Sequence, residues 1–320
     1  MIHRRKFLQL SGAALSGALA YQLSGCTTPE AKRAWGVQLC SIPQMVANDF
    51  AGTLKTLQEF GYRQIEFFGP YDFSAQATID GWKPIAAQMG IKQNAFYGYE
   101  LAEVKKMLDD HNISSPSAHL DMATLRTNMA PAMKSLSSLG VQYVVIPALR
   151  EEKKETIDDY MRIAEEFNSF GKQMMEHGIT FVYHNHGYEH ALKDGQVPMD
   201  VLITNTDTDL VNFELDIFWM QAAGASPVEY LKKYPGRYKL MHVKDAAEPV
   251  RFSGDGSTVE EWMALFPKMA DPGAGVFKID EIVEAGIQSG VEHFFLERDL
   301  APDPINTLKN SYQYLSGLGS

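Results

Sequence analysis

Cysteine and positive charge are both scarce in this sequence. Only two of the 320 residues are cysteines, Cys26 and Cys40, which excludes a fold held together by several disulfide bonds. Acidic side chains outnumber lysine and arginine by 40 to 29, and the formal net charge is −11. Nucleic acid and anionic lipid surfaces repel an acidic protein. We therefore expect no nucleic-acid partner and no electrostatic attachment to a membrane.

Two features of nucleotide-binding or multidomain proteins are also missing. No strand-like run opens a Gly-rich dinucleotide-binding turn, which argues against an open, doubly wound sheet. No low-complexity linker divides the chain, and its 45 % hydrophobic and 22 % charged residues are typical of a globular protein. A single large α/β domain fits this length.

The first 25 residues have the features of an export signal. The opening segment MIHRRKFLQL places Arg4 and Arg5 just before a Phe-Leu pair and resembles a twin-arginine signal. The weakly apolar stretch that follows is too short to span a bilayer stably. The segment LSGC then ends at Cys26 and resembles a lipobox, in which the cysteine receives lipid and becomes the mature N-terminus. We expect a signal over residues 1–25 and a linker over residues 26–34.

These resemblances imply an exported lipoprotein of bacterial type, periplasmic or in the cell envelope, that touches a membrane only through the lipid on Cys26. The alternative is an ordinary amphipathic first helix. After removal of the signal, Cys40 would be the only other cysteine, so no internal disulfide could form. The twin-arginine route carries folded proteins, so a metal could be loaded before export.

Eight short β-rich runs alternate with longer helical patterns along the rest of the chain. The expected strands are residues 35–41, 63–69, 114–120, 141–149, 179–186, 211–218, 238–245 and 292–299. The expected helices include residues 49–61, 100–112, 124–140, 157–178 and 279–290, and several of them end on glycine, as helix C-termini do. Alternating strands and helices imply a parallel sheet.

Eight such repeats in one domain favour a closed (β/α)8 barrel, a TIM barrel, over residues 35–320. Two segments do not fit the minimal repeat. They are a helix-poor insert at residues 71–99, after the second strand, and a long loop at residues 246–277, after the seventh. Both would lie at the C-terminal rim of the barrel, where loops build the active site. We expect them to form part of its lid or wall.

The segment YHNHGYEH at residues 183–190 contains three histidines directly after an apolar run. Alternation along a strand would send Tyr183 and Asn185 to one face and His184 and His186 to the other. Two imidazoles on one face suggest a ligand cluster. The alternative is a strand end that carries polar residues into solvent.

Polar side chains gather at the C-terminal ends of the expected strands, and in a barrel these ends converge on one face. Four of them, on strands five to eight, combine two imidazoles and two carboxylates. This set suits one Mn, Zn, Fe or Co ion better than Mg or Ca. The predicted metal ligands are His184, Asp216, His242 and Glu297. The other polar strand-end residues are Gln38, Glu66, His119, His186, Lys244 and Arg298.

Several of these residues have an alternative structural interpretation. His119 could be hydrogen-bonded by the backbone, Glu66 could form a salt bridge at the rim, and Lys244 could pair with a neighbouring carboxylate. His186 and Glu189 could orient the metal ligands rather than contact a substrate. A purely structural role explains the four predicted metal ligands less well. Four independent strands each place one of these ionisable groups at the same rim.

At these strands the sequence resembles the sugar phosphate isomerase/epimerase family of xylose isomerase-like barrels, which includes the tagatose 3-epimerases and endonuclease IV. The resemblance covers nearly the whole chain after the signal, and its most specific segments are GVQLCS, IEFFG, SAHL, FELDIFW, MHVKD and FLERD. It implies one divalent metal held by Glu, Asp, His and Glu on strands five to eight. The last three ligands carry over as Asp216, His242 and Glu297.

The chain departs from the family pattern at two positions. Strand five reads HN where the family has EN, so His184 stands in the position of the glutamate. In the epimerases the strand-five and strand-eight glutamates act as two acid/base groups on opposite faces of the sugar, so one of them is missing here. Trp219 stands three residues after Asp216, where many relatives have another histidine. The chain therefore looks like a separate subfamily.

The resemblance and the residue types together predict a divalent-metal-dependent sugar isomerase or epimerase. It would act on a sugar or keto-sugar by removing a proton next to a carbonyl. The expected catalytic groups are Glu297, His184 and Lys244. The expected substrate contacts are Gln38, Glu66, His119, His186, Glu189, Trp219 and Arg298.

Other functions stay open at this point. The lost strand-five glutamate makes a lyase or hydrolase the main alternative, for example one that cleaves a 3-keto-glycoside by β-elimination. A non-catalytic sugar-binding lipoprotein is another, although a plain binding site would not need Glu297 beside Arg298 and Asp299. Phosphodiester cleavage, as in endonuclease IV, is disfavoured by the acidic body. The sequence does not define the sugar, the metal or the oligomeric state.

Overall fold

The computed structural model describes residues 33–89, 96–150 and 152–318. The predicted signal at residues 1–25 and the predicted linker at residues 26–34, apart from its last two residues, lie outside the described residues and stay predictions. Residues Arg33–Ser320 form one unit. No helix in the described part of the chain is both long enough and apolar enough to cross a membrane.

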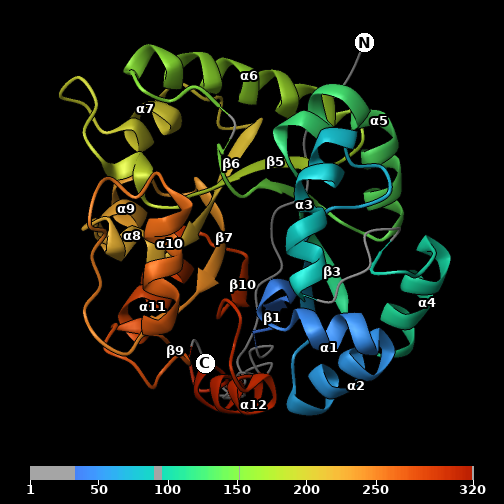
Figure 1. Cartoon of the computed structure of the whole chain (residues 1–320). Helices are drawn as coiled ribbons and strands as arrows, with labels where there is room; N and C mark the ends of the chain where they lie inside the picture. Colours follow the sequence, from blue (N-terminus) through green and yellow to red (C-terminus); the bar gives the residue numbers. More distant parts are fainter. Residues whose placement is uncertain (1–32, 90–95, 151, 319–320) are drawn as a thin grey trace, which may run out of the picture. The chain divides into compact units, whose positions relative to one another are not determined.

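Eight parallel strands close into a barrel with helices on its outside (Figure 1). The order around the barrel is β1-β10-β7-β6-β5-β4-β3-β2, and β1 pairs with both β10 and β2, which closes the sheet. The expected (β/α)8 fold and all eight expected strands are confirmed. The strands are β1 (Trp35–Gln38), β2 (Gln64–Phe67), β3 (Ser114–His119), β4 (Tyr143–Ile146), β5 (Thr180–His184), β6 (Val211–Asp216), β7 (Tyr238–Val243) and β10 (His293–Leu296).

Helices connect the strands and cover the barrel, and all five expected helical patterns are confirmed, as α2, α4, α5, α6 and α11. The α-helices are α1 (Pro43–Asn48), α2 (Phe50–Phe60), α3 (Gln76–Met89), α4 (Leu101–Asp110), α5 (Met122–Ser138), α6 (Ile157–Met175), α7 (Pro198–Thr204), α8 (Ile217–Ala222), α9 (Pro227–Lys233), α10 (Val259–Leu265), α11 (Ile279–Ser289) and α12 (Pro304–Leu315). Short 3-10 helices are η1 (Leu39–Ser41), η2 (Tyr188–His190) and η3 (Phe266–Lys268).

Local capping residues explain where these helices begin and end. The carboxylate of Asp49 accepts a hydrogen bond from the N–H of Gly52 at the start of α2, and Gly61 ends that helix with a φ of 110°. Residues with a side chain rarely adopt this left-handed conformation. Thr156 and Asp159 form a capping box at the start of α6. These boundaries are therefore determined locally.

The interior of the barrel has an apolar layer below a polar one. Tyr143, Val145, Val182, Leu240 and Phe295 form a separate buried cluster. Side chains alternate along a strand, so a residue two positions after a residue that points into the barrel also points into it. This rule applies to the residues that follow Val182, Leu240 and Phe295 by two positions. These residues are His184, His242 and Glu297. The apolar layer therefore forms a floor under the predicted site.

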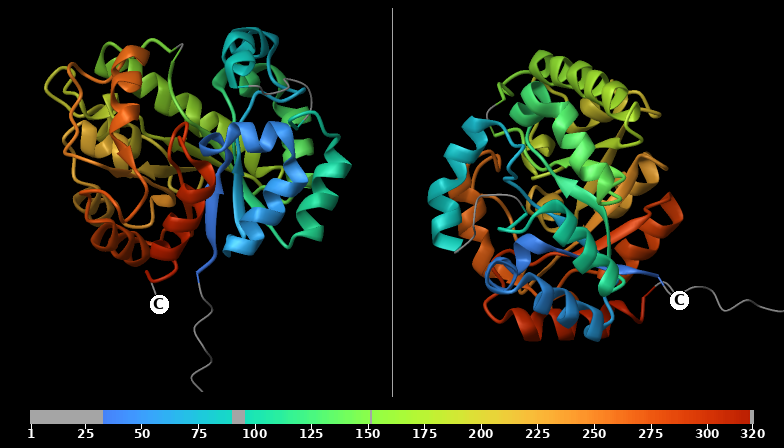
Figure 2. Two further views of the ribbon diagram at one scale, coloured as in Figure 1. Left: turned by 60° about the horizontal axis from the view of Figure 1, so that its bottom comes forward. Right: turned by 90° about the vertical axis from the view of Figure 1, so that its right-hand side faces the viewer.

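One expectation about the two inserts is wrong. Residues 71–99 are not helix-poor, because they contain the 14-residue helix α3. Gly81 and Pro84 lie inside this helix, and both residue types argue against a helix on propensity. The loop at residues 246–277 contains α10, and short strands at its ends, β8 (Asp245–Ala246) and β9 (Met269–Ala270), pair in antiparallel fashion. Helices α3 and α10 lie on opposite sides of one barrel rim (Figures 1 and 2).

We predict that Gly36→Val destabilises the barrel. Gly36 pairs with Phe295 in the sheet register, and a Cβ atom on Gly36 would overlap the Phe295 ring. Overpacking of this kind costs about 1–3 kcal/mol, which urea unfolding measures as a lower transition midpoint. Gly81→Ala is the control, because a Cβ at Gly81 would meet open space beyond its own helix within the described residues. Equal midpoints for Gly36→Val and the unaltered protein would contradict the close packing.

Candidate functional site

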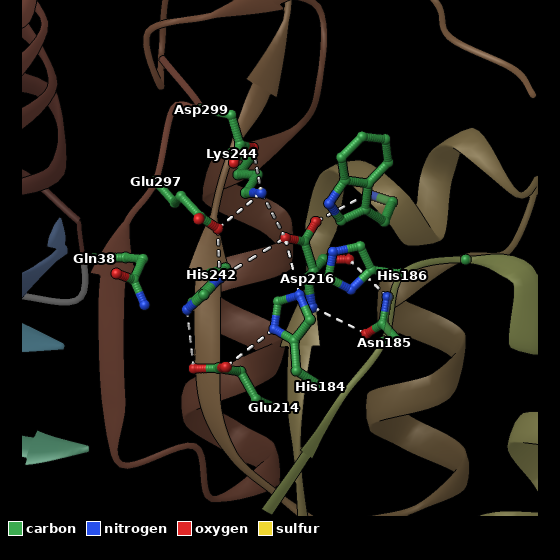
Figure 3. A network of polar contacts seen from close by, with 12 residues as sticks. Gln38, His184, Asn185, His186, Glu214, Asp216, His242, Lys244, Glu297 and Asp299 are labelled. Carbon is green, nitrogen blue, oxygen red and sulfur yellow. Dashed lines mark hydrogen bonds and ion pairs between the residues drawn. The ribbon is translucent and has the colours of Figure 1, made fainter. Parts of the chain in front are cut away.

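The predicted metal ligands come together at the C-terminal end of the barrel. His184 ends β5, Asp216 ends β6, and Glu297 follows directly after β10. His242 lies on β7 beside Asp216 in the strand register. All four side chains are buried, and they point toward one another (Figure 3).

The distances between the ligand atoms resemble those of a metal site. His184 Nε2 lies 3.6 Å from Asp216 Oδ2, and His242 Nδ1 lies 3.8 Å from the same oxygen. Two ligands of one tetrahedral ion are about 3.4 Å apart. His242 Nδ1 is closer to Glu297 Oε2, at 2.6 Å. Asp216, His242 and Glu297 each offer a ligand atom within 4.8 Å of the other two, and His184 adjoins this group through Asp216 Oδ2.

Two of these atoms lack a hydrogen bond within the described part of the chain. Asp216 Oδ2 and His242 Nδ1 are buried without one, although both have oppositely charged groups within ion-pair distance. A buried polar atom without a hydrogen bond is costly, and a bound cation is one way to satisfy it. The set of donors suits Mn, Zn, Fe or Co. Asp216, His242 and Glu297 thus fit a divalent metal, and His184 lies beside them as the fourth predicted ligand.

Carboxylates behind the two histidines fix the orientation of the rings. Glu214 Oε2 lies 3.0 Å from His184 Nδ1, and Glu214 Oε1 lies 3.1 Å from His242 Nε2. Glu66 Oε2 lies 2.6 Å from the same Nε2 atom. Each imidazole can therefore donate one ring N–H to a carboxylate while its other nitrogen faces Asp216. Metal-bound histidines in proteins have this arrangement.

Lys244 brings a positive charge into contact with two of the predicted ligands. Its Nζ lies 3.1 Å from Asp216 Oδ2, 2.7 Å from Glu297 Oε2 and 2.8 Å from Asp299 Oδ2. Burial lowers the pKa of Lys244, but the three carboxylates outweigh burial and raise that pKa well above its usual value. Lys244 therefore partly neutralises the carboxylates that a metal would also use.

The backbone after β5 and β6 holds the ligands in place. Asn185 accepts a hydrogen bond from the N–H of Asp216 at 3.0 Å and donates one to its carbonyl at 3.3 Å. Asp216 Oδ1 accepts the N–H of Trp219 at 2.9 Å and so caps α8. Its second oxygen is left facing the two histidines. Capping and ligand placement are thus achieved by one side chain.

A second polar group lies beside the ligands, on strands β1 to β3. Gln38 donates to Glu66 Oε2 at 2.8 Å, and Ser117 donates to Glu66 Oε1 at 2.6 Å. His119 Nε2 lies 3.1 Å from Glu66 and 3.4 Å from Glu214. Burial lowers the pKa of His119, but these carboxylates outweigh burial and raise that pKa to about 9. Glu66 therefore belongs to a buried network and not to a salt bridge at the rim.

A cavity of about 320 Å³ opens at the polar cluster. Its polar end is lined by His184, Lys244, Glu297 and Asp299. One wall comes from residues 71–85, which include part of α3, and another comes from Trp262 and Phe266, in the loop after β7. The expectation that both inserts form a wall of the site is confirmed.

The predicted substrate contacts divide into three groups. His119, His186 and Trp219 line the cavity, and the rings of His186 and Trp219 are stacked with 5.8 Å between their centres. Gln38 and Glu66 are fully buried within the network. Neither of the latter two is among the residues that line the cavity.

Glu189 and Arg298 form the third group, and neither is among the residues that line the cavity. Glu189 accepts hydrogen bonds from the Tyr183 hydroxyl and from the N–H groups of His186 and Gly187, so it fixes the loop after β5. The Arg298 guanidinium pairs with Asp271. Arg298 follows Glu297 by one residue, and alternation sends the two side chains to opposite sides. The predicted contacts of Glu189 and Arg298 with substrate have no structural support.

Sequence reasoning missed several residues of the site. Glu214 lies two residues before Asp216, and Asp299 lies two residues after Glu297, so the period of a strand already places each pair on one side. On β6 the prediction used only the final residue of the strand. Cys40, Arg150 and Trp262 line the cavity from loops and short helices, where no sequence periodicity indicates direction.

A family model described as xylose isomerase-like TIM barrel matches residues 54–297. The chain belongs to this family. The match runs from α2 to Glu297 and includes all four predicted metal ligands. The expected relationship to xylose isomerase-like barrels is therefore confirmed.

Two solved structures illustrate the shared fold. A sugar phosphate isomerase/epimerase from Parabacteroides distasonis ATCC 8503 is 25 % identical, with a TM-score of 0.70, over 92 % of this chain and 96 % of that one. The IolI protein with a bound zinc atom is 16 % identical, with a TM-score of 0.63, over 89 % of this chain and 96 % of that one. The second likeness concerns the fold alone.

Bacterial inosose dehydratases are similar to part of this xylose isomerase-like barrel. Inosose dehydratase 2 from Bacillus cereus is 26 % identical over 170 residues, which are 53 % of this chain and 55 % of that protein. An inosose dehydratase from Bacillus thuringiensis strain Al Hakam is 26 % identical over 175 residues. The chain thus matches about half the length of these relatives. The family therefore includes sugar-processing enzymes.

Proposed function

We propose that the protein is a divalent-metal-dependent enzyme that acts on a sugar or keto-sugar by removing a proton next to a carbonyl. The observation that carries this proposal is the cluster of Asp216, His242 and Glu297, with His184 beside it, next to a cavity that His184 and Glu297 line. The names of the relatives support it, because they include a sugar phosphate isomerase/epimerase, inosose dehydratases and a zinc-containing barrel.

The proposed cofactor is one Mn, Zn, Fe or Co ion held by these four residues. Such an ion polarises a carbonyl and stabilises the negative charge that develops beside it. Glu214 orients both imidazoles from behind. Asn185 holds the backbone of Asp216. The residues of the protein would hold the metal ligands in place and transfer the proton.

Glu297 is the group best placed to move that proton. Its carboxylate lines the cavity, and Oε2 lies 2.7 Å from Lys244 Nζ. The carboxylate can accept a proton from the carbon next to the carbonyl, and the ammonium can donate one to a nearby oxygen. The ring nitrogens of His184 face Glu214 and Asp216. We therefore assign His184 to metal binding rather than to proton transfer.

Two outcomes can follow from removal of the proton. Return of the proton gives isomerisation or epimerisation, whereas expulsion of a leaving group gives β-elimination, for example from a 3-keto-glycoside. The ammonium of Lys244 beside Glu297 favours elimination as the second candidate, because it places an acid next to the base. Relatives named dehydratases agree with this candidate. A non-catalytic sugar-binding protein is the alternative from another class.

The proposed partner is a sugar-like small molecule, with no nucleic acid. We further propose that the protein is exported by its twin-arginine signal and is held in the cell envelope by lipid on Cys26. This part rests on Arg4, Arg5 and the LSGC segment alone.

We predict that the purified protein binds one divalent ion and that Asp216→Ala weakens this binding at least about tenfold. Asp216 Oδ2 lies between the two histidines, so its loss opens the centre of the site. Elemental analysis after dialysis against limiting zinc or manganese measures the retained metal. Asp209→Ala, an exposed acid before β6, is the control. Equal metal in all three proteins would contradict the assignment.

Glu297→Gln should slow hydrogen exchange at the carbon next to the carbonyl by about 100-fold or more, the range for loss of a general base. The assay incubates metal-loaded protein in heavy water with an inosose or a 3-keto-glucoside and follows deuterium by mass spectrometry. Glu284→Gln, an exposed residue on α11, is the control. An isomerase returns a labelled sugar of the same formula, and a lyase releases the leaving group. Turnover without exchange or elimination would exclude proton abstraction and indicate hydrolysis.

Arg4→Lys together with Arg5→Lys should leave the precursor in the cytoplasm, because the export machinery recognises the twin-arginine pair. Cys26→Ala should release the exported protein from membranes, since it removes the lipid attachment. Cell fractionation followed by immunoblotting measures both effects. Unaltered protein that is found free in the cytoplasm would refute the export proposal.

A further inference from the structure

One wall of the cavity is a helix face of small and apolar residues. The residues of α3 that line the cavity recur at intervals of three and four, so they lie on one side of the helix. They are Ala77, Thr78, Gly81, Trp82 and Ile85. This face looks into the cavity rather than into the protein core.

The middle of this face is open. Apart from its two chain neighbours and the nearby backbone of α3, a Cβ atom added to Gly81 would have no atom of the described chain within 4 Å. Trp82 and Ile85 beside it are only partly buried. Three neighbouring positions therefore present an apolar surface that the described part of the chain leaves partly open.

Hydrogen bonds hold this surface in position. Thr78 donates to Asp121 at 2.7 Å, and the N–H of Ala75 donates to Thr124 at 2.9 Å, which ties the start of α3 to α5. The Trp82 ring also contacts Phe68, with 6.4 Å between the ring centres. The wall is thus prearranged for a ligand, which lowers the entropy cost of binding.

The loop after β7 supplies aromatic surface from another side of the cavity. Trp262 donates its ring N–H to the carbonyl of Gly256 at 2.7 Å and lies 4.7 Å from the ring of His186. The guanidinium of Arg150 lies 5.2 Å from the Trp262 ring centre. The cavity therefore combines a polar end, formed by the ligand cluster, with aromatic and apolar walls.

We infer that the substrate carries a second ring and that the cavity face of α3 binds it. This inference rests on the proposed function, in which the reacting sugar lies at the polar end. The hydroxyl groups of one sugar suit that end, but they do not suit the apolar wall formed by Gly81, Trp82 and Ile85. The face of a second six-membered ring does suit it, whether the ring belongs to another sugar or to an aromatic group. The substrate class is thus a glycoside rather than a free monosaccharide.

Gly81→Leu tests this inference, because it adds a bulky side chain at a position where a Cβ atom meets open space, and it replaces a poor helix former by a good one. The ligands are methyl β-D-glucoside, which has one ring, and phenyl β-D-glucoside and cellobiose, which have two. Calorimetric titration of the metal-loaded protein measures their dissociation constants. The unaltered protein should bind at least one two-ring ligand about tenfold more tightly than the methyl glucoside.

Gly81→Leu should abolish that difference and leave binding of methyl β-D-glucoside unchanged. Ala87→Leu is the matched control, since Ala87 is an exposed residue of the same helix that is not among the cavity-lining residues, and it should behave like the unaltered protein. If Gly81→Leu weakens the binding of phenyl β-D-glucoside alone, the second ring is an aromatic group. If it weakens the binding of cellobiose alone, the second ring is another sugar.

Equal affinity for one-ring and two-ring ligands, no binding of any of them at millimolar concentration, or an equal loss for all ligands in Gly81→Leu would overturn the inference. Titration reports binding without turnover. If the proposed reaction is wrong, Gly81→Leu should still weaken the binding of two-ring ligands selectively. If the α3 site is wrong, the unaltered protein should still catalyse the hydrogen exchange that depends on Glu297.

Discussion

Buried negative charge at the barrel mouth is the constraint on which the site depends. Four carboxylates are almost completely buried there, those of Glu66, Glu214, Asp216 and Glu297. A buried charge is tolerated only with partners, and the charged partners here are the ammonium of Lys244 and the imidazoles of His119 and His242. Burial lowers the pKa of His184 well below its usual value, so this ring pairs with Glu214 as a neutral hydrogen-bond partner. Burial lowers the pKa of His242, but Glu214, Glu297 and Glu66 outweigh it and raise that pKa. Protons and a metal ion compete for such nitrogens, so a bound cation would take over the balancing of charge.

The period of a strand explains how much of this arrangement can be predicted from sequence. An apolar residue two positions before each of His184, His242 and Glu297 forms the floor below them, and the same rule applied backwards from Asp216 would have identified Glu214. Applied forwards from Glu297, it would have identified Asp299 and turned Arg298 outward. The strands, the fold and the ligand cluster were predictable because each depends on local alternation and on the convergence of parallel strands.

The walls of the cavity were not predictable in the same way. Gly81 and Pro84 have low helix propensity, so the sequence does not indicate helix α3 clearly. The position of α3 depends on hydrogen bonds such as that from Thr78 to Asp121, which join segments more than forty residues apart. Trp262 reaches the cavity from a loop whose path is fixed by the contact of its ring N–H with Gly256. Both inserts could be assigned to the correct rim, because that follows from topology. Which side chains face inward follows from tertiary contacts that no periodic pattern encodes.

The histidine at the end of β5 narrows the chemistry that the site can support. Epimerisation by two bases needs acid/base groups on opposite faces of the sugar, and the resemblance places one of them at the position of His184. Here Nδ1 of that residue faces Glu214 at 3.0 Å and Nε2 faces Asp216 at 3.6 Å, so neither nitrogen is directed at a substrate. In the proposed reaction, proton transfer is therefore assigned to Glu297, with Lys244 beside it. A base and an acid on one side are sufficient for isomerisation or for β-elimination, and a leaving group that occupies the α3 wall would favour elimination.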